Sequence, residues 1–588
     1  MRSKVIAAIA LALSCVSMAA DMSSKTHLVD PPTTYCNPMN LDYAFAPDRA
    51  YSHNNAHRST ADPVCIMYKG LYYLFSTNQE GYWWSKDMAS WHFISHFFKE
   101  NASRDQVCAP AAWPTKQGIL FLPCFVDADI MPLYLSKDPI SGSWKEAVES
   151  YPVPSTWDPS LFEDDDGRMY AYWGSSNFYP MYAVELDQKN GYQPIGKKIE
   201  TLRLDPKKHG WEQFGENNQN GTMDPFIEGS WMNKFNGKYY LQYGAPGTEY
   251  NVYGDGVYVA DHPLGPFKYQ EHNPFSWKPG GFIRGAGHGS TFNDSYGNLW
   301  HIATMVISVK QTFERRLGLF PAGVDKDGVL FADTSFGDYP QYLPKHQRDP
   351  HSTFTGWMLL SYKKKAWASS SKHDTALAFD EDIKTYWSAT DGKPGQFLAV
   401  DLGKQMDVNA IQINYADEDA NLFGKQHGIH HRYQIFDSDD GKTWNLLIDK
   451  SKNKFDVPHD YLELSAPVKT RYLKIVNIEM PTGCFAIGDF RVFGKASGEA
   501  PAKVSGFKID RDEKDRRNLA LKWDSVPGAY AYEISFGVSP DKMYSSILVN
   551  GNTKYDLHSL NVDSPYYFHV QSVGESGVST PSELCSVK

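Results

Sequence analysis

The sequence lacks the clustered positive charge by which proteins attract nucleic acids and anionic lipids. Its 588 residues include 58 Lys and Arg against 69 Asp and Glu, a formal net charge of −11, and contain no block or stripe of basic residues. Phosphate backbones and anionic membrane surfaces are bound through such clusters. Nucleic acid is therefore not an expected partner.

Long hydrophobic runs are also missing beyond the N-terminus. No later stretch approaches the roughly 18 apolar residues of a membrane-spanning helix, so no membrane span is expected. The N-terminus has Arg2 and Lys4, an apolar run over 5–13 and small residues over 17–20, which is the pattern of an export signal. We predict a signal peptide at residues 1–20 and a bacterial protein that is periplasmic, on the cell surface or secreted; lipid attachment at Cys15 is the alternative.

Metal-binding cysteine patterns are absent as well. Six cysteines follow the predicted signal peptide, and none lies in a CxxC or Cys/His spacing typical of zinc sites. We expect structural cysteines, either buried or paired, at Cys36, Cys65, Cys108, Cys124, Cys484 and Cys585.

Aromatic residues and turn formers are plentiful. Aromatics make up 14% of the chain, alongside 45 Gly and 35 Pro, a composition that favours short strands joined by tight turns. The chain also exceeds the roughly 250–300 residues at which a single core stops growing. We therefore predict a mostly β protein of two to four domains.

Five segments share one pattern: a small or acidic residue opens an apolar strand, and a Gly-containing turn and an aromatic-rich strand follow. Their spacing is near the length of a four-stranded propeller blade, with longer insertions in the third and fourth units. The fold prediction is all-β, with a five-bladed β-propeller over residues 30–350. The five openings lie at Asp62, Ala109, Asp158, Glu228 and His288.

The pattern changes near residue 350. Alternating strands over 352–495 predict an antiparallel β-sandwich. A linker rich in Ala, Ser, Gly and Pro at 496–505 leads to a second small β-sandwich over 501–588.

Three of the five repeat openings are acidic: Asp62, Asp158 and Glu228. The first strand of each propeller blade lines the central axis, so these residues would converge on one funnel. Buried charge has a desolvation cost that calls for a functional reason. Glycoside hydrolysis supplies one, because a carboxylic acid protonates the leaving oxygen while a carboxylate about 6.5–9.5 Å away activates water in inverting enzymes. Capping of turns by Asp-Pro and Glu-Gly is the structural alternative.

Residues 35–345 resemble glycoside hydrolase family 43, a family of five-bladed propellers that act as inverting glycosidases. The resemblance is carried by Asn37-Pro38-Met39-Asn40-Leu41-Asp42-Tyr43, Ala61-Asp62-Pro63, Trp157-Asp158-Pro159-Ser160-Leu161-Phe162, Ile227-Glu228-Gly229-Ser230 and Gly287-His288-Gly289-Ser290.

This resemblance implies a role for each acid. Asp62 would be the general base that activates water, Glu228 the general acid, and Asp158 the residue that orients Glu228 and tunes its pKa. About eighteen residues are inserted between Asp42 and Asp62, which leaves Asp42 as a rival for the base.

Two further residues are candidates for the site. By resemblance, His288 is the axial histidine, which can stand beside a water-ligated calcium or other cation in the channel; no cofactor is required. Arg284 could reach a substrate hydroxyl or the acid, with a surface role as the alternative.

Aromatic side chains offer apolar faces on which sugar rings stack. Packing between blades is the alternative for each of them individually. The candidate substrate-binding aromatics are Trp83, Trp113, Trp157 and Trp231, together with Trp84, Phe178 and Tyr179.

The two C-terminal units resemble known modules. Residues 352–495 resemble coagulation factor type C, discoidin-like domains, through motifs such as Thr385-Tyr386-Trp387-Ser388 and Val400-Asp401-Leu402-Gly403. Residues 501–588 resemble a fibronectin type III module, with Trp523, Tyr532 and Tyr566 at core positions. The discoidin-like unit has an unusual loop over 416–431, for which we expect packing over the propeller mouth, with metal binding as the alternative.

These observations predict an exo-acting inverting glycosidase whose partner is an oligo- or polysaccharide of the plant cell wall. The pentose specificity, as an α-L-arabinofuranosidase or β-xylosidase, rests on the resemblance alone. A β-galactosidase or exo-galactanase of the same fold, a retaining enzyme and a non-catalytic carbohydrate-binding protein are the alternatives.

Overall fold

The computed structural model describes residues 27–46, 56–99, 107–125, 131–154 and 156–588. The predicted signal peptide and Cys15 lie outside these residues. No helix in the described part is long and apolar enough to cross a membrane. The predicted all-β class is confirmed, because the strands are accompanied there only by short 3-10 helices: η1 (Pro139–Ser141), η2 (Gln188–Asn190), η3 (Gly210–Glu212), η4 (Glu216–Asn218), η5 (Pro350–Ser352) and η6 (Thr375–Ala378).

Five antiparallel sheets follow one another from residue 64 to residue 332, and in each the strands pair in chain order. The first contains β2 (Val64–Tyr68), β3 (Leu71–Phe75), β4 (Gly81–Ser85) and β5 (Trp91–Ser95). The second contains β6 (Ala111–Thr115), β7 (Gly118–Leu122), β8 (Leu133–Asp138) and β9 (Ser143–Val148). The third contains β10 (Ser160–Glu163), β11 (Met169–Trp173), β12 (Met181–Asp187) and β13 (Gln193–Leu202). The fourth contains β14 (Glu228–Phe235), β15 (Lys238–Ala245), β16 (Gly254–Ala260), β17 (Lys268–Tyr269) and the additional β18 (Ser276–Trp277). The fifth contains β19 (Arg284–Asn293), β20 (Leu299–Val306), β21 (Arg315–Val324) and β22 (Leu330–Ala332).

The first strands of these sheets contact one another in a closed cycle, from β2 through β6, β10, β14 and β19 back to β2. A separate hydrophobic core fills each gap between neighbouring sheets. Successive side chains of a strand point to opposite faces, so Leu161 of β10 packs toward the second sheet and Phe162 toward the fourth. The openings of the five sheets are thereby brought to one centre. The short pair of β1 (Thr34–Tyr35) and β23 (Gln341–Tyr342) joins the two ends of this region.

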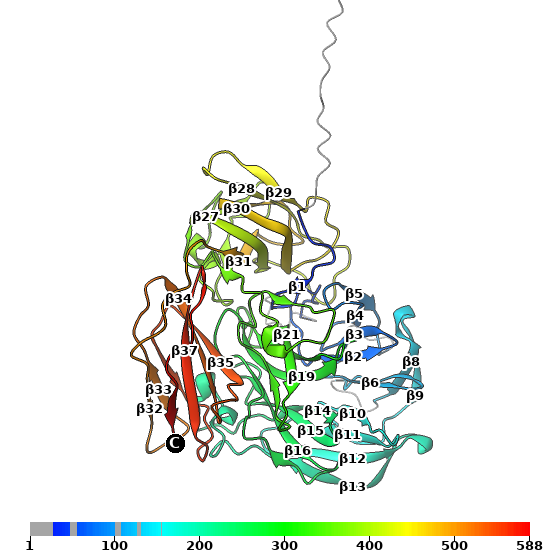
Figure 1. Cartoon of the computed structure of the whole chain (residues 1–588). Coiled ribbons are helices and arrows are strands. Elements are labelled where there is room, and N and C mark those ends of the chain that lie inside the picture. The colour runs from blue at the N-terminus through cyan, green and yellow to red at the C-terminus, as the bar shows by residue number, and fades with distance from the viewer. Residues whose placement is uncertain (1–26, 47–55, 100–106, 126–130, 155) are drawn as a thin grey trace, which may run out of the picture.

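A middle unit follows, and it is built around long strands. Its core contains Trp387, Leu398, Ile413 and Ile475 among many buried apolar residues. Figure 1 shows it in yellow-green above the five sheets. Its strands are β24 (Met358–Leu359), β25 (Lys365–Ala368), β26 (Trp387–Ser388), β27 (Phe397–Tyr415), β28 (Arg432–Ser438), β29 (Asn445–Asp449), β30 (His459–Glu479) and β31 (Ala486–Lys495).

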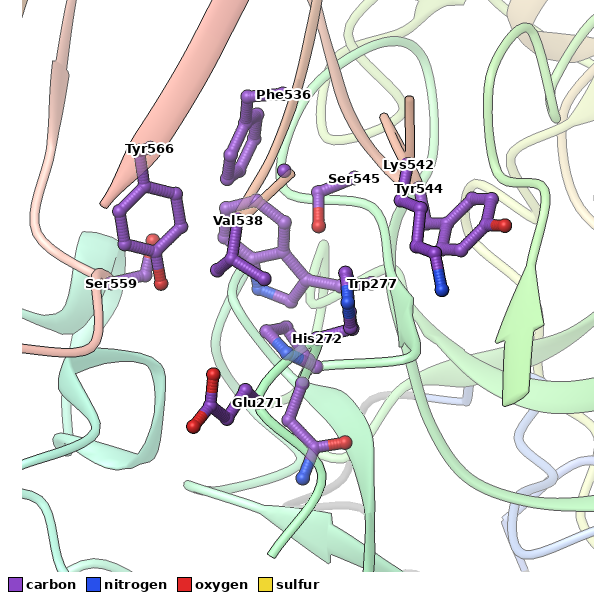
Figure 2. A pocket seen from close by; sticks show the side chains of 13 residues that line it. Glu271, His272, Trp277, Phe536, Val538, Lys542, Tyr544, Ser545, Ser559 and Tyr566 are labelled. Atoms are coloured by element: carbon purple, nitrogen blue, oxygen red, sulfur yellow. The ribbon is translucent and has the colours of Figure 1, made fainter. Parts of the chain in front are cut away.

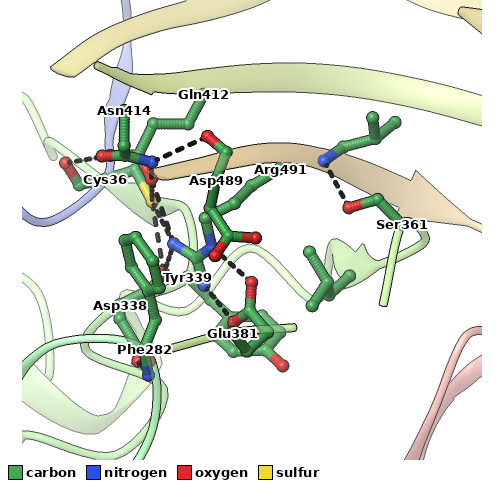
Figure 3. Close-up of polar contacts among 12 residues, drawn as sticks. Cys36, Phe282, Asp338, Tyr339, Ser361, Glu381, Gln412, Asn414, Asp489 and Arg491 are labelled. Carbon is green, nitrogen blue, oxygen red and sulfur yellow. Dashed lines mark hydrogen bonds and ion pairs between the residues drawn. The ribbon is translucent and has the colours of Figure 1, made fainter. Parts of the chain in front are cut away.

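Arg491 of β31 ties the middle unit to the five-sheet region (Figure 3). Its guanidinium makes two hydrogen bonds to Glu381, at 2.8 and 2.9 Å, and a third to the carbonyl of Asp338 at 2.6 Å. All of these groups are buried. The pair with Glu381 lies within the middle unit and compensates the buried charge of Arg491, while the bond to Asp338 crosses to the five-sheet region.

The C-terminal unit (residues 501–588) forms two sheets that share one core. Trp277 of the fourth sheet belongs to the same core, and Figure 2 shows it at the small cavity beside Phe536, Val538 and Tyr566. This unit, coloured from orange-brown to red in Figure 1, therefore packs directly against the five-sheet region. Its strands are β32 (Lys508–Arg511), β33 (Leu519–Lys522), β36 (Lys554–Leu557) in one sheet, and β34 (Ala529–Gly537), β35 (Ser545–Asn550), β37 (Tyr566–Gly574), β38 (Gly577–Val578) and β39 (Cys585–Val587) in the other.

The six cysteines predicted to be structural are all free thiols in the described part of the chain. Cys36, Cys65, Cys124 and Cys484 are buried. The buried alternative therefore describes these four, and none of the six is paired within the described residues.

Candidate active site

The five sheet openings share an unusual backbone conformation. A residue in the left-handed region stands at or next to each opening, with φ of 57° at Asp62, 47° at Ala109, 48° at Asp158, 69° at Gly229 and 40° at His288. Residues with a Cβ rarely adopt this region, and each instance costs about 1–3 kcal/mol. Gly229 has no Cβ and adopts this region freely, so the repeat found in the sequence is accompanied by backbone strain at the other four openings. Such strain persists where the surrounding structure holds functional side chains in place.

The three acidic openings line one cavity of about 430 Å³. Asp62 and Asp158 are each separated by one residue from the strand that follows, β2 and β10, and Glu228 begins β14, so each acid comes from a different sheet. The remaining lining residues are Cys108, Trp157, Ser175, Asn177, Phe214, Met223, Phe226, Gly247, Thr248, Glu249, Phe313 and Arg315. Polar and charged groups thus face the same cavity as aromatic and aliphatic side chains, a mixture that suits a polar ligand with apolar faces.

Asp62 is held from both of its carboxylate oxygens. The Thr77 hydroxyl donates a 2.6 Å hydrogen bond to Oδ2, and Arg315 Nη1 lies 3.9 Å from Oδ1. His288 Nδ1 is 3.2 Å from the same Oδ1. The backbone N–H of Asp62 donates to Thr304 at 2.8 Å, which fixes the turn itself. The carboxylate is therefore oriented while it faces the cavity.

Glu228 has the electrostatics of a proton donor. Burial is the largest cause that raises its pKa, to about 8, and the negative charge of Asp62 adds to the shift. Tyr253 donates a 2.5 Å hydrogen bond to Glu228 Oε1 and, with Arg315, opposes that rise. A carboxyl group with this pKa is protonated near neutral pH, as a general acid requires.

Asp158 has a raised pKa as well, at about 7. Burial is the largest cause, His288 opposes it, and the charges of Glu228 and Asp62 contribute to the rise. Its Oδ2 lies 3.8 Å from His288 Nδ1. The negative charge of Glu228 thus disfavours the ionised form of Asp158 across the cavity.

His288 is fixed by its backbone. Asp255 of β16 accepts the N–H groups of His288 at 2.6 Å and Gly289 at 2.9 Å. A Cβ on Gly229 would lie 2.6 Å from the imidazole ring, so only glycine fits there. One nitrogen of His288 and carboxylate oxygens of Asp158 and Glu228 lie within 4.8 Å of one another, the only set of three metal-ligating groups found among the described residues.

The aromatic predictions divide into two groups. Trp157 lines the cavity and is 43% exposed. Trp83 is 0% exposed and donates to Asp42 at 2.6 Å, which corrects its assignment: a side chain in the core between the first and fifth sheets offers no face to a sugar. Trp113 and Trp231 pack against each other, with ring centroids 5.8 Å apart, and neither lines the cavity.

Two polar residues predicted as site candidates, Arg284 and Asp42, do not line the cavity. Arg284 begins β19 and lies near Tyr555 of the C-terminal unit rather than in the cavity lining. Arg315, the first residue of β21, occupies the cavity instead and donates to Thr248 at 3.1 Å. Asp42, the rival base, is engaged by Trp83 and by Lys425 at 2.9 Å and is not among the lining residues.

Sequence reasoning missed Arg315, Tyr253 and Asp255. None of them opens a repeat or belongs to a motif. Arg315 and Asp255 lie on the third strands of their sheets, β21 and β16, and Tyr253 immediately precedes β16. The one available signal was a charged residue between glycines, Gly254-Asp255-Gly256, within an otherwise apolar strand.

The 416–431 loop packs against the N-terminal part of the five-sheet region. Asp417 accepts a 2.9 Å hydrogen bond from the buried Arg58, Lys425 pairs with Asp42, and Gly424 forms a β-bridge with Phe45. Asp417 and Lys425 are thus used in the contact between units, whereas Asp419 pairs with Lys372 inside the middle unit.

Residues 56–330 match the family model of glycosyl hydrolases family 43, and residues 364–487 match the F5/8 type C domain. Residues 56–330 are therefore similar to the family 43 glycosyl hydrolases. The first match spans all three acids, and the second spans most of the middle unit, which confirms both of these predicted resemblances.

Individual relatives of the family 43 domain match over shorter stretches. A beta-xylosidase of Xylanibacter ruminicola is 31% identical over 160 residues, which cover 24% of this chain and 44% of that protein. An arabinoxylan arabinofuranohydrolase of Paenibacillus polymyxa is 29% identical over 188 residues, covering 29% of this chain and 27% of that protein. The chain thus spans less than half the length of either relative. Among solved structures, Bacteroides ovatus xyloglucan PUL GH43B aligns with a TM-score of 0.41 at 13% identity, covering 93% of this chain and 97% of that one.

Proposed function

We propose that the protein is an exo-acting inverting glycosidase that removes terminal sugars from plant cell-wall polysaccharides. The observation that carries this proposal is the joint placement of Asp62, Asp158 and Glu228 in one cavity, with the pKa of Glu228 raised to about 8. Binding alone gives no reason to bury three carboxyl groups together, because their desolvation is costly. The family 43 domain supports the same chemistry.

Each acid has a distinct role in the proposed reaction. Glu228 protonates the glycosidic oxygen as the bond to the leaving group breaks. Asp62, held by Thr77 and Arg315, takes a proton from the water that attacks the anomeric carbon from the opposite face, which inverts the configuration. Asp158 acts on Glu228 by charge repulsion and helps to keep it protonated.

A terminal pentose is the proposed sugar, as in an α-L-arabinofuranosidase or a β-xylosidase. The names of the two relatives, a beta-xylosidase and an arabinoxylan arabinofuranohydrolase, support it. The cavity also fits a polysaccharide, because a second, smaller cavity adjoins it at Asn177, which lines both. Phe178 and Tyr179 line that second cavity and are 71% and 68% exposed. Exposed aromatic faces stack on sugar rings. Galactose release remains the second candidate within this chemistry.

The proposal includes a specific fold for each of the three parts of the chain. We propose a five-bladed β-propeller over 30–350, supported by the closed cycle of first strands and its five inter-sheet cores. A discoidin-like β-sandwich over 352–495 and a fibronectin type III-like β-sandwich over 501–588 follow. The shared core of two sheets supports the last assignment. An export signal at 1–20 would place the enzyme in the periplasm, on the cell surface or outside the cell.

A cation beside His288 also remains a proposal. The nearby ligand set offers one nitrogen and the carboxylates of Asp158 and Glu228, whereas calcium takes six to eight oxygen ligands. Waters would therefore have to supply most of the coordination, and the ion would serve to hold His288 in the channel. Calcium titration followed by calorimetry, compared with His288→Ala, tests this directly.

Sugar release decides the proposed function. Wild type, Asp62→Asn and Glu228→Gln are compared on nitrophenyl α-L-arabinofuranoside, β-D-xyloside and β-D-galactoside and on a plant polysaccharide panel. We expect wild type to release one monosaccharide and both variants to lose most of that activity on the polysaccharide. Glycan binding without any cleavage would instead favour a carbohydrate-binding protein.

A further inference from the structure

One wall of the sugar cavity is a long connection between two sheets. Residues 203–227 join β13 to β14 and end directly at Glu228. Phe214, Met223 and Phe226 of this segment line the cavity. On its inner side, the buried Glu212 accepts a 2.5 Å hydrogen bond from Tyr243 of β15. The segment thus connects the cavity wall to the general acid.

The outer side of the 203–227 segment is bound by the C-terminal unit. Gly210 N–H donates to the carbonyl of Leu560 at 3.0 Å, and Val562 N–H donates to the carbonyl of Lys208 at 2.9 Å. His209 Nδ1 lies 2.9 Å from Asn561 Oδ1. Backbone pairing of this kind is more than a loose contact, because it fixes which residues of the two segments lie opposite each other.

Arg517 adds a side-chain clamp beside this pairing. Asp515 holds its guanidinium through two hydrogen bonds of 2.8 and 2.6 Å. The remaining donor, Nη1, reaches the carbonyl of Pro206 at 2.8 Å and Gln213 Oε1 at 2.6 Å. The amide of Gln213 in turn donates to the carbonyl of Asn218. Arg517 therefore fixes the residue next to Phe214 and, through it, the turn that follows.

The 203–227 segment and the C-terminal unit are tightly packed at Gly210. A Cβ on Gly210 would lie 2.5 Å from the carbonyl oxygen of His558 and 2.9 Å from Arg517 Cβ. The glycine allows the segment to approach the C-terminal unit at backbone distance.

We infer that the C-terminal unit is a positioning element of the sugar cavity, with Arg517 and residues 558–562 holding the wall formed by Phe214 and Met223. This inference rests on the proposed glycosidase function for its kinetic consequence. Arg517 touches no substrate; it acts through Gln213 and the 203–227 segment. Loosening that wall raises the KM for the terminal sugar. The carboxyl groups of Asp62 and Glu228 have hydrogen bonds of their own to Thr77 and Tyr253, outside the 203–227 segment, so kcat stays close to its wild-type value.

The test uses single variants of the full chain. Arg517→Ala removes the clamp, and Lys514→Ala is the matched control because it removes the same charge from an exposed position of the same turn. We expect Arg517→Ala to raise KM roughly five- to twenty-fold with kcat within two-fold, and Arg517→Lys to recover part of the loss. Equal KM values for Arg517→Ala and Lys514→Ala would overturn the inference.

A second readout keeps the test independent of catalysis. Hydrogen exchange of the backbone amides in 205–222 should be faster in Arg517→Ala than in Lys514→Ala, and unchanged exchange would contradict the clamp. If Arg517→Ala does not fold, Gln213→Ala removes the same contact from the other side, with the same expected exchange. If wild type cleaves no glycoside, the proposed function fails, whereas the exchange comparison still decides whether the C-terminal unit holds the wall.

Discussion

Two clusters of buried charge in this molecule have opposite electrostatics. Around Arg58, the carboxylates of Asp417 and Asp456 are both paired with the guanidinium, and the charge of Arg58 lowers the pKa of Asp456 to about 2 against the effect of burial. In the cavity, burial raises the pKa of Asp158 to about 7 and of Glu228 to about 8. The paired charges around Arg58 join two units, whereas the carboxyl groups of the cavity are not fully paired and can exchange protons.

A raised pKa is not sufficient to identify a site. Burial also raises the pKa values of Glu212 and Glu533 to about 8, yet neither residue lines the cavity. The catalytic reading depends on the combination of a raised pKa, a cavity large enough for a sugar, and a second carboxylate facing the same space.

The largest expected effect lies on the catalytic side of the comparison. Asp62→Asn removes the proposed base without changing side-chain size, and we expect roughly 10²–10⁴-fold lower kcat. The loss should be the same for substrates with good and poor leaving groups, because water activation is needed for both. Steady-state kinetics on two leaving groups measure this. Near-wild-type turnover would exclude Asp62 as the base.

The structural cluster predicts a large effect on stability instead. Arg58→Ala removes the guanidinium from two buried carboxylates, Asp417 and Asp456, which costs about 3–5 kcal/mol. Arg168→Ala is the control, since Arg168 and Asp166 form an exposed pair that water and salt screen, so its loss has little effect on stability. Thermal unfolding of both variants separates the two, and similar melting temperatures would refute the structural role of Arg58.

The same comparison predicts opposite responses of stability to pH. Asp456 has a depressed pKa, so its stabilisation is present above the unfolded pKa of about 4 and is lost as the pH falls through about 2. Glu228 has a raised pKa, so its stability contribution is complete below about 4.5 and is lost as the pH rises through about 8. We therefore expect Glu228→Gln to raise Tm at pH 8 by roughly 2–5 °C and to leave it nearly unchanged at pH 4. An equal shift at both pH values would argue against the raised pKa.

The smallest expected effect concerns the tuning of the acid. The Tyr253 hydroxyl donates to Glu228 and lowers its pKa. Tyr253→Phe keeps the ring and removes that bond, so the pKa of Glu228 should rise further. The alkaline limb of the kcat/KM profile, where the acid loses its proton, should move to higher pH by up to about one unit. A shift to lower pH would show that another group controls that limb.

The sequence repeat located the three acids because the five openings are equivalent positions in similar sheets. The structure brings Asp62, Asp158, Glu228 and Trp157 to one cavity, as the repeat predicts. Trp83 does not reach the cavity, because it lies in a core between two sheets. Side chains that fill such a core and side chains that line a binding site both alternate along a strand with period two. Periodicity alone does not separate these two environments.

Residues that reach the site from elsewhere in the sheets do not belong to the sequence repeat. Arg315, Tyr253 and Asp255 reach the site only when the five sheets have assembled. The contact of the C-terminal unit with the 203–227 segment is likewise set by docking, because more than 290 residues of sequence separate its two sides. Long-range packing, rather than local pattern, determines these parts of the site.

The most direct test of the acid role of Glu228 is its dependence on the leaving group. For the sugar that wild type releases, kcat/KM of Glu228→Gln relative to wild type is measured on a nitrophenyl glycoside and on an unactivated oligosaccharide. Nitrophenolate leaves without protonation, so the account predicts a small loss on the first substrate and a loss larger by roughly 10²-fold or more on the second. Equal losses on both substrates would contradict the assignment of Glu228 as the proton donor.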